Sequence, residues 1–385
     1  MRYISKIILS VLCMTWLFFT CCMINTAKPE AAGPTLYPQK WATGTGTASN
    51  PWANNCLNTA LTNCPTGGTI YLKAGYYTLS ALLPIYKEVN IIGEGRDKTI
   101  IVLDITNASG IYIQADYVTL KGFTVDGASQ TDGVGYFSCI AIGHPTNYLT
   151  LEDIEVKNAG EIGINYGNIN HSKFQNIYAH DNYHDGLHSS TTLVGRGKYN
   201  TYRDIYCWNN GTHGFDDGGV ELVVEDCHNL YDNIQAWDNG TDGIVFWLIS
   251  GGIVSNCSAW GNGNDGIVLG LVKDFDVHDC TANFNDYFGI RTVETENINF
   301  TNVIAKNNNV GIAIEDCRNI VLTSCQSYDD RDIPLQLYGI QLTETNTGIS
   351  LSNCKLSPNA IGEIYNPAGA VVTVITKKKF PLRSL

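Results

Sequence analysis

Residues 242–270 read DGIVFWLISGGIVSNCSAWGNGNDGIVLG, and this stretch contains the same pattern twice. In each copy a glycine, Gly243 or Gly266, is followed by an apolar residue and then by period-two alternation, which is the period of a β-strand. A second short strand pattern, IVSNCSAWGN at 253–262, lies between the copies and ends in Asn and Gly, which favour turns. The stretch therefore predicts short strands and tight turns, repeated every 23 residues.

The same unit recurs through most of the chain. No unit contains ten consecutive residues with helical periodicity, and the glycines follow one another at intervals of 23, 28, 29, 23, 23, 22 and 28 residues. We therefore infer a basic repeat of 22–23 residues with three insertions of five or six. The glycines that mark the repeat are Gly163, Gly186, Gly214, Gly243, Gly266, Gly289, Gly311 and Gly339.

Two or three short strands per unit cannot bury their apolar face alone, but stacked units can. Leucine-rich repeats have this length but need a leucine signature that is missing, and the glycine-rich Ca²⁺-binding nonapeptide is missing too. The prediction is an all-β, single-domain parallel β-helix of about twelve coils. Cysteines recur in this register, as in Cys257 and Cys280, so we interpret them as small buried side chains rather than as disulfides.

Composition excludes several classes of protein. A chain of 385 residues with 44% hydrophobic and 16% charged residues is neither disordered nor a multi-pass membrane protein. Acidic residues outnumber basic ones, giving a net charge of −13, so nucleic acid is a poor partner.

The chain divides into four segments. Arg2 and Lys6 precede a short apolar run, which predicts a signal peptide and an extracytoplasmic location, secreted or at the cell surface. Cys21 and Cys22 leave a lipid anchor open. No other stretch predicts a membrane-spanning helix. The predicted segments are 1–27 (cleavage as late as 32), an N-terminal segment with a short capping helix over 33–68, the β-helix over 69–375 and a basic tail over 376–385.

Strand alternation assigns the residues two positions after each repeat glycine to the outer surface. Most members of this row are unremarkable, but Asn165, His188 and Asp216 are polar on three successive coils. Asp185 and His213 each precede a repeat glycine on the same coils. The inward positions Ser189 and Asp217 are polar where other coils are apolar, so this is the strongest candidate for a functional site.

Two further features accompany these coils. The longest insertions, 191–200 and 217–231, follow the same strands and predict the walls of a groove, the first carrying Arg196 and Lys198. On the upstream strands Trp208, Trp237 and Trp260 occupy equivalent positions, and such a row either binds sugar rings or shields the core. A row of asparagines just beyond them predicts a structural ladder of stacked amides.

The opening segments GGTIYLKAGYYTL and VNIIGEGRDKTII and the repeat together resemble the right-handed parallel β-helix superfamily of pectate lyases, over essentially the whole mature chain. The segment DGLHSS…YRDIYCWNNGTHGFDD is most similar to the Ca²⁺-dependent family-nine pectate lyases. That resemblance implies a Ca²⁺ site at Asp185 and Asp216. It supplies no catalytic lysine, because Val245 stands at the matching position.

We therefore expect a secreted polysaccharide lyase that cleaves an acidic, uronate-containing polymer by β-elimination. Removal of the proton α to a carboxylate needs a base and a positive charge, and an imidazole suits the base. The alternatives are a non-catalytic glycan-binding surface protein, a uronate C5-epimerase or a glycoside hydrolase. The expected site residues are His188, His213, Asp216, Arg196 and Lys198 for catalysis, Asn165, Trp208, Trp237, Trp260 and Arg203 for substrate, and Asp185, Asp216 and Asp217 for Ca²⁺.

Overall fold

The structure is a computed structural model that describes residues 35–36, 57–128, 130–131, 133, 137–143, 145–189, 197–218, 227–343, 345–367 and 369–375. These residues all belong to the unit Ala32–Leu385. The expected signal peptide, the basic tail and Arg196 lie outside the described residues. Among the described residues, no helix is long and apolar enough to cross a membrane.

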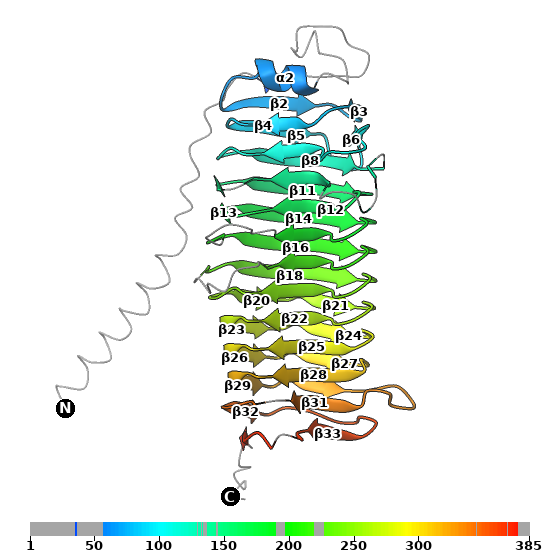
Figure 1. The fold of residues 1–385 in the computed structure, drawn as a ribbon, viewed down its shortest axis with the longest axis vertical. Helices are drawn as coiled ribbons and strands as arrows, with labels where there is room; N and C mark the ends of the chain where they lie inside the picture. Colours follow the sequence, from blue (N-terminus) through cyan, green and yellow to red (C-terminus); the bar gives the residue numbers. More distant parts are fainter. Residues whose placement is uncertain are drawn as a thin grey trace, which may run out of the picture. The chain divides into compact units, whose positions relative to one another are not determined.

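The chain winds through two large parallel sheets, in which each strand pairs with its counterparts one coil before and one coil after (Figure 1). The 12-stranded sheet, called here the site sheet, contains β4 (Leu83–Ile85), β7 (Ile111–Ile113), β9 (Ser138–Ile142), β12 (Ile162–Tyr166), β15 (Leu187–Ser189), β17 (Phe215–Asp217), β19 (Ile244–Trp247), β22 (Ile267–Gly270), β25 (Phe288–Val293), β28 (Val310–Glu315), β31 (Tyr338–Thr343) and β33 (Gly362–Tyr365). Its twelve strands match the expected number of coils.

The 20-stranded sheet, called here the long sheet, supplies the remaining sides of each coil. Its strands are β1 (Thr35–Leu36), β2 (Gly68–Leu72), β3 (Gly75–Leu79), β5 (Val89–Gly93), β6 (Thr99–Leu103), β8 (Thr119–Asp126), β11 (Thr150–Lys157), β14 (Lys173–His180), β16 (Thr201–Trp208), β18 (Leu230–Trp237), β20 (Ile253–Ser255), β21 (Ser258–Trp260), β23 (Lys273–His278), β24 (Thr281–Asn283), β26 (Glu296–Thr301), β27 (Ile304–Lys306), β29 (Arg318–Thr323), β30 (Gln326–Tyr328), β32 (Ile349–Ser352) and β34 (Val372–Ile375). Two short strands, β10 (Thr146–Asn147) and β13 (Ile169–Asn170), form a separate pair.

The register of the site sheet confirms the predicted faces. Ile164 pairs with Leu187, which pairs with Phe215, and all three side chains are buried. One residue further on, Asn165 pairs with His188 and His188 with Asp216. Because parallel pairing keeps equivalent residues side by side, these three polar side chains form one outward row.

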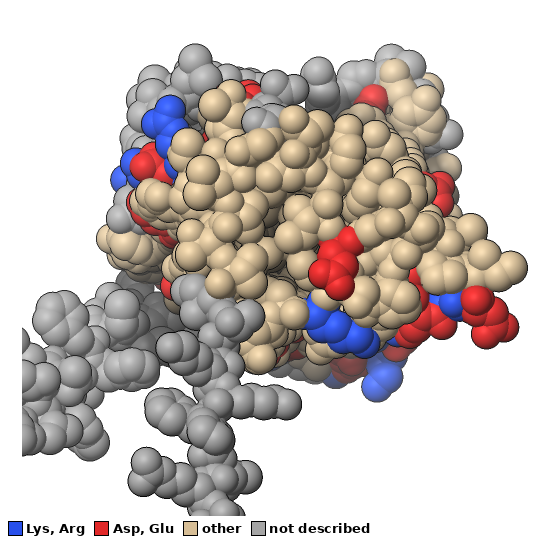
Figure 2. Space-filling view, turned by 90° about the horizontal axis from the view of Figure 1, so that it is seen from below, with Lys and Arg blue, Asp and Glu red and all other residues tan. Residues whose placement is uncertain are grey.

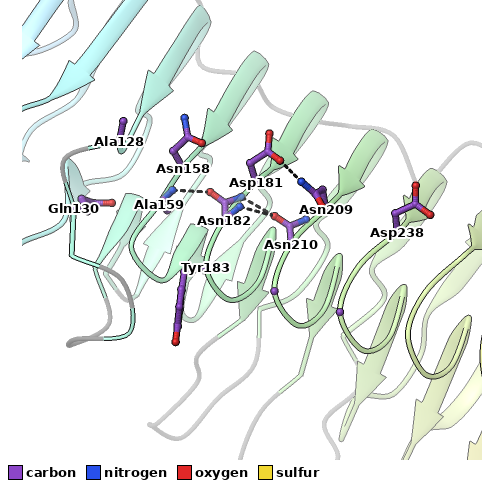
Figure 3. A pocket seen from close by; sticks show the side chains of 12 residues that line it. Ala128, Gln130, Asn158, Ala159, Asp181, Asn182, Tyr183, Asn209, Asn210 and Asp238 are labelled. Atoms are coloured by element: carbon purple, nitrogen blue, oxygen red, sulfur yellow. Dashed lines mark hydrogen bonds between the residues drawn. The ribbon is translucent and has the colours of Figure 1, made fainter.

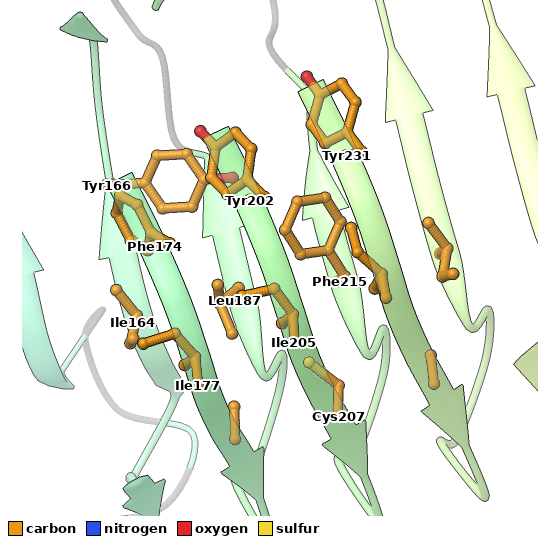
Figure 4. Packing of buried hydrophobic residues seen from close by; sticks show 14 of the residues in the cluster. Ile164, Tyr166, Phe174, Ile177, Leu187, Tyr202, Ile205, Cys207, Phe215 and Tyr231 are labelled. Carbon is orange, nitrogen blue, oxygen red and sulfur yellow. The ribbon is translucent and has the colours of Figure 1, made fainter. Parts of the chain in front are cut away.

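The interior is apolar and closely packed along the stack. Tyr166, Tyr202 and Tyr231 come from successive coils and pack with Phe174 and Phe215 (Figure 4). The nine described cysteines are free thiols, and all except Cys354 are buried. The interpretation of the cysteines as small core side chains is confirmed for these positions.

The predicted asparagine ladder is confirmed, and it joins successive turns. Asn239 Nδ2 donates to Asn262 Oδ1 at 3.0 Å, and Asn239 Oδ1 accepts from Asn210 Nδ2 at 2.9 Å. The ladder also explains the repeat glycine, since a Cβ on Gly243 would lie 2.7 Å from Asn262 Nδ2 and 2.7 Å from Gly266 O. Glycine is therefore required here by close approach of the neighbouring coil.

The structure confirms a short helix within the predicted N-terminal segment 33–68. Its described part, α2, covers Leu57–Asn63 and lies at the N-terminal end of the stack (Figure 1). Its buried face contains Leu57, Ala60 and Leu61. Strand β1 precedes this helix and pairs with β2, which the sequence did not predict.

A second unpredicted feature is an aromatic ladder at the corner where the site sheet leads into the long sheet. Tyr117, Tyr148, His171, Tyr199 and His228 all have positive φ, between 50° and 59°. Their rings stack at centroid distances of 4.8 to 5.3 Å. Left-handed backbone is unfavourable for bulky residues, and stacking between coils offsets that cost.

The C-terminal end of the stack, seen in Figure 2, is mostly uncharged, with a few charged side chains among the tan surface. Ile361, Val371 and Val374 of the last described coil are exposed.

We predict that Asn239→Ala lowers the free energy of unfolding by at least about 2 kcal/mol, because it leaves the buried partners on two coils without hydrogen bonds. Urea unfolding measures the change. Asn299→Ala is the matched control, since its side chain also bonds to the preceding coil, at Asp276, but is exposed, so a change within about 0.5 kcal/mol is expected. Equal losses in the two variants would contradict the ladder's structural role.

Candidate functional site

Strands β15 and β17 hold the centre of the site on the outer face of the site sheet. His188 Nδ1 lies 3.1 Å from Asp185 Oδ2 and 3.0 Å from Asp216 Oδ2. The three ligand atoms lie within 4.8 Å of one another. The His188 side chain is 28% exposed, so a molecule at the surface can reach it. The predicted grouping of Asp185, His188 and Asp216, called here the Asp–His cluster, is thus formed by the structure.

Asp185 is the buried anchor of this cluster, with no exposed side-chain surface. Its Oδ1 accepts hydrogen bonds from the Thr212 hydroxyl and, at 2.9 Å, from the His213 backbone N–H. Its Oδ2 lies 3.1 Å from His184 Nδ1 as well as from His188. Burial acts to raise the pKa of Asp185, but the contacts with the His184 and His188 imidazoles and the charges of His213 and His188 hold it well below its usual range.

Asp185 and Asp216 shift the pKa of His188 upward. Burial favours the neutral form of His188, but contacts with Asp185 and Asp216 raise the pKa of His188 to about 10. Neither carboxylate is aligned with the imidazole as a hydrogen-bond acceptor, and among the described residues His188 Nδ1 and Asp216 Oδ1 are buried without a hydrogen-bond partner. The cluster therefore combines strong charge interactions with buried polar atoms that lack a hydrogen-bond partner among the described residues.

A second imidazole lies one coil further along. His213 Nδ1 is 3.3 Å from Asp242 Oδ2 and 3.0 Å from Thr241 Oγ1. Burial works against the charged form, but Asp242, with the charges of Asp185 and Asp216, raises the pKa of His213. A carboxylate that holds one ring nitrogen of a histidine fixes the ring, and therefore the direction in which the other ring nitrogen points.

Asp242 was missed by the sequence analysis. It immediately precedes repeat glycine Gly243, as Asp185 and His213 precede theirs, and Asp265 follows at the same position one coil on. Four consecutive polar residues at this position, where Ile162 and Phe288 lie on either side, are the signal that could have identified it.

Asp242 is itself held in place. Its Oδ1 accepts from Asn264 Nδ2 at 2.8 Å and from the Asp265 backbone N–H at 2.9 Å. Burial raises the pKa of Asp265 to about 7, with the charge of Asp242 adding to the effect and the Phe288 backbone N–H opposing it. The polar residues that precede the repeat glycines thus continue past the cluster to Asp265. Arg291 lies 3.9 Å from Asp265 Oδ2 and is paired with Glu315 at 2.9 Å.

Asp217 does not join the cluster, which corrects the expected set of cation ligands. Alternation turns its side chain into the interior, where its Oδ2 accepts a hydrogen bond of 2.5 Å from the Tyr231 hydroxyl. The remaining donors do not suit Ca²⁺, which takes six to eight oxygen ligands, because the third converging atom is an imidazole nitrogen.

The remaining basic residues of the expected site are dispersed. Arg203 lies on β16 in the long sheet, where its Nε bonds to Asp232 Oδ2 at 3.0 Å. Lys198 precedes the corner residue Tyr199, and its backbone N–H donates to Asn170 Oδ1. Most of the two insertions, residues 190–196 and 219–226, lies outside the described residues, so the predicted loop walls of the groove stay a prediction.

An open groove of about 800 Å³ runs along the turns that lead into the site strands (Figure 3). Asp181, Asn209 and Asp238 line it on successive coils, and Tyr183, 52% exposed, projects from the turn. One residue, His184, separates Tyr183 from Asp185 along the chain.

The predicted tryptophan row is present, and its rings stack on one another. Trp208 and Trp237 are 5.0 Å apart with an interplanar angle of 6°, and Trp237 and Trp260 are 5.0 Å apart at 1°. His180 stacks on the other side of Trp208 at 4.1 Å. Because neighbouring rings cover the flat faces, the row presents ring edges rather than platforms for sugars. Its role in substrate binding stays a prediction.

Comparisons with known proteins agree with this architecture. Residues 209–326 match the family model of the right-handed β-helix region. The A-module of mannuronan C-5 epimerase AlgE6 from Azotobacter vinelandii is a similar solved structure, with a TM-score of 0.64, 17% identity and coverage of 80% of this chain and 91% of that chain. No curated protein matches the sequence.

Two further solved structures have the same fold. The catalytic unit of the GH87 α-1,3-glucanase from Streptomyces thermodiastaticus strain HF3-3 has a TM-score of 0.64 and 14% identity, with coverage of 91% of this chain and 69% of that chain. The Dettilon tailspike protein has a TM-score of 0.56 and 12% identity, with coverage of 86% and 68%. At these identities the likeness concerns the fold alone, which is a right-handed parallel β-helix.

We predict that Asp185→Asn lowers the free energy of unfolding by about 3 kcal/mol at pH 7, because it removes a buried charge paired with two imidazoles. A carboxyl whose folded pKa is depressed stabilises the fold above its unfolded pKa, roughly 3.9, and that contribution is lost as pH falls below it. The difference between wild type and variant should therefore shrink from pH 5 to pH 3.

Urea unfolding in the presence of chelator measures this difference. The control is Asp276→Asn, an exposed aspartate that bonds to Asn299 and should change stability by less than about 0.5 kcal/mol at every pH. A difference for Asp185→Asn that stays constant down to pH 3 would contradict the assignment of Asp185 as a paired, ionised carboxylate.

Proposed function

We propose that this protein is a secreted carbohydrate-active enzyme that removes the C5 proton of a uronate unit in an acidic polysaccharide and cleaves the chain by β-elimination. The best support for the proposal is that two groups occur on adjacent coils of the site sheet. One is the His213 imidazole, which Asp242 orients, and the other is the Asp–His cluster. The similar folds of a mannuronan epimerase module and a glucanase support a carbohydrate substrate.

His213 is the proposed base. Asp242 and Thr241 occupy its Nδ1 side, which leaves Nε2 to accept a proton from the substrate. No lysine is needed for this step, which agrees with Val245 at the position where the family-nine pectate lyases have their catalytic lysine. Asp242 is therefore a positioning residue: it sets the ring orientation and stabilises the imidazolium that forms.

The Asp–His cluster is the proposed position of the uronate carboxylate. Asp185, Asp216 and Asp242 carry negative charge close together, and the imidazoles of His188 and His213 offset it only in part, so a further positive charge would favour the binding of an anionic sugar. A divalent cation held by the cluster would supply that charge and stabilise the enolate-like intermediate. Asn165, adjacent to His188 in the outward row, is placed to contact the same sugar.

The proposed elimination balances without a further reactant. The C5–H bond breaks as His213 takes the proton, a C4–C5 double bond forms, and the bond from C4 to the glycosidic oxygen breaks. The departing oxygen takes up a proton, which the imidazolium of His213 can return. Epimerisation shares the first step but then protonates C5 from the opposite face, and the glycosidic bond stays intact.

Glycoside hydrolysis fits this geometry less well. Two carboxyl groups would have to flank the glycosidic bond about 5 Å or more apart, one of them able to protonate it. Asp185 is fully buried and ionised, and Asp217 faces the interior. Only Asp216 of these three is partly exposed on the outer face, so these three carboxyl groups supply no flanking pair.

We predict that His213→Gln lowers the rate of unsaturated product formation from the substrate uronate polymer by at least about 100-fold, the usual contribution of a general base. The measurement is ultraviolet absorbance of purified protein with pectate, alginate and other uronate polymers. His278→Gln is the matched control, because His278 also contacts an aspartate at 3.0 Å but lies exposed on the long sheet.

Full activity of His213→Gln would contradict its assignment as the base. The absence of unsaturated product from wild type on every polymer, at high protein concentration and across pH, would contradict the elimination itself.

A further inference from the structure

We propose that the Asp–His cluster is a binding site for a divalent transition-metal ion of the Zn²⁺ or Mn²⁺ type, rather than for Ca²⁺. This inference deepens the proposed function, because it identifies the cation that the uronate carboxylate would meet. It rests on the geometry of Asp185, His188 and Asp216 and stands without any activity.

Three possible ligand atoms converge at the cluster. One nitrogen and two carboxylate oxygens, from three side chains on two adjacent strands, lie within 4.8 Å of one another. His188 Nδ1 is close to both carboxylates, at 3.1 and 3.0 Å, but forms an aligned hydrogen bond to neither. Buried polar atoms in a native protein normally have a partner, and an ion at their common focus supplies one.

The neighbouring coil holds the carboxylate of Asp185 in a fixed orientation. Asp185 Oδ1 is held by the Thr212 hydroxyl and the His213 backbone N–H, and Oδ2 is held by His184 Nδ1 at 3.1 Å, so the carboxylate is fixed in orientation and Oδ2 keeps a second lone pair for the ion. Such bonds to a ligating carboxylate orient it and are part of a metal site. Asp216 has a buried second oxygen, Oδ1, without a partner among the described residues, so it can bind through either oxygen.

The types of ligand atom favour a transition metal. Carboxylates alone suit Mg²⁺ and Ca²⁺, whereas imidazole suits Zn²⁺ and other transition metals. Three protein ligands with one partly exposed side, where His188 is 28% exposed, leave coordination positions open to water or substrate. Two carboxylates also neutralise a divalent ion, so that the bound site no longer repels an anionic sugar.

The test is direct metal binding by the purified full-length protein after treatment with chelator. Isothermal titration with Zn²⁺, Mn²⁺ and Ca²⁺ gives affinity and stoichiometry, and the visible spectrum of bound Co²⁺ reports nitrogen coordination. We expect one ion per chain, Zn²⁺ or Mn²⁺ binding at least tenfold more tightly than Ca²⁺, and a Co²⁺ spectrum typical of imidazole ligation.

Variants locate the ion. His188→Gln and Asp216→Asn should each weaken Zn²⁺ binding at least tenfold and abolish the Co²⁺ spectrum, while circular dichroism shows that both variants stay folded. His278→Gln, in which a histidine next to a single aspartate is removed, should bind like wild type. Two variants guard against a loss caused by misfolding, since His188 and Asp216 lie on separate strands.

Three results would overturn the proposal: no binding of any of these ions, Ca²⁺ binding as tightly as Zn²⁺, or unchanged Zn²⁺ binding in His188→Gln. These results differ from the result expected if only the proposed enzyme function is wrong. In that case Zn²⁺ binds at the cluster and depends on His188, but no uronate polymer is converted with or without the metal.

Discussion

The alignment of each coil directly over the previous one is the constraint on which the rest of the structure depends. Backbone pairing in the two sheets fixes the register, and the buried asparagine ladder, for example Asn210 to Asn239 to Asn262, fixes it again at the turns. The repeat glycines permit this close approach. A shift of one residue in any coil would exchange its inward and outward faces, so the register also decides which side chains reach the surface.

The candidate site uses this register as a scaffold. Asp185 and His188 lie on one coil and His213 and Asp216 on the next, and the strand spacing, about 4.8 Å, brings them into contact without any long loop. The buried side of the cluster is satisfied by the neighbouring coil, through Thr212 and the backbone of His213. Its outer side is open. A rigid, partly unsatisfied group at a surface is the expected design for binding an ion or a charged substrate.

The fold was predictable because its signals are local and repeated, and the register then predicted that Asp185, His188 and Asp216 meet. Side chains at corners were not predictable in the same way. Asp242 lies outside the strand alternation, and nothing in tyrosine as a residue type indicates the left-handed backbone of Tyr199 and its counterparts. The expected Ca²⁺ site came from a resemblance in which two aspartates matched, whereas the donor that distinguishes this chain is a histidine.

Proton abstraction at C5 is the central chemical claim, and the fate of that hydrogen tests it most directly. A uronate oligomer labelled with deuterium at C5 would be incubated with the protein and the products analysed by mass spectrometry and NMR. The account predicts that each converted sugar loses its label to solvent, by elimination through the base His213. Cleaved products that keep the C5 label would mean that the bond breaks by hydrolysis and would contradict the account.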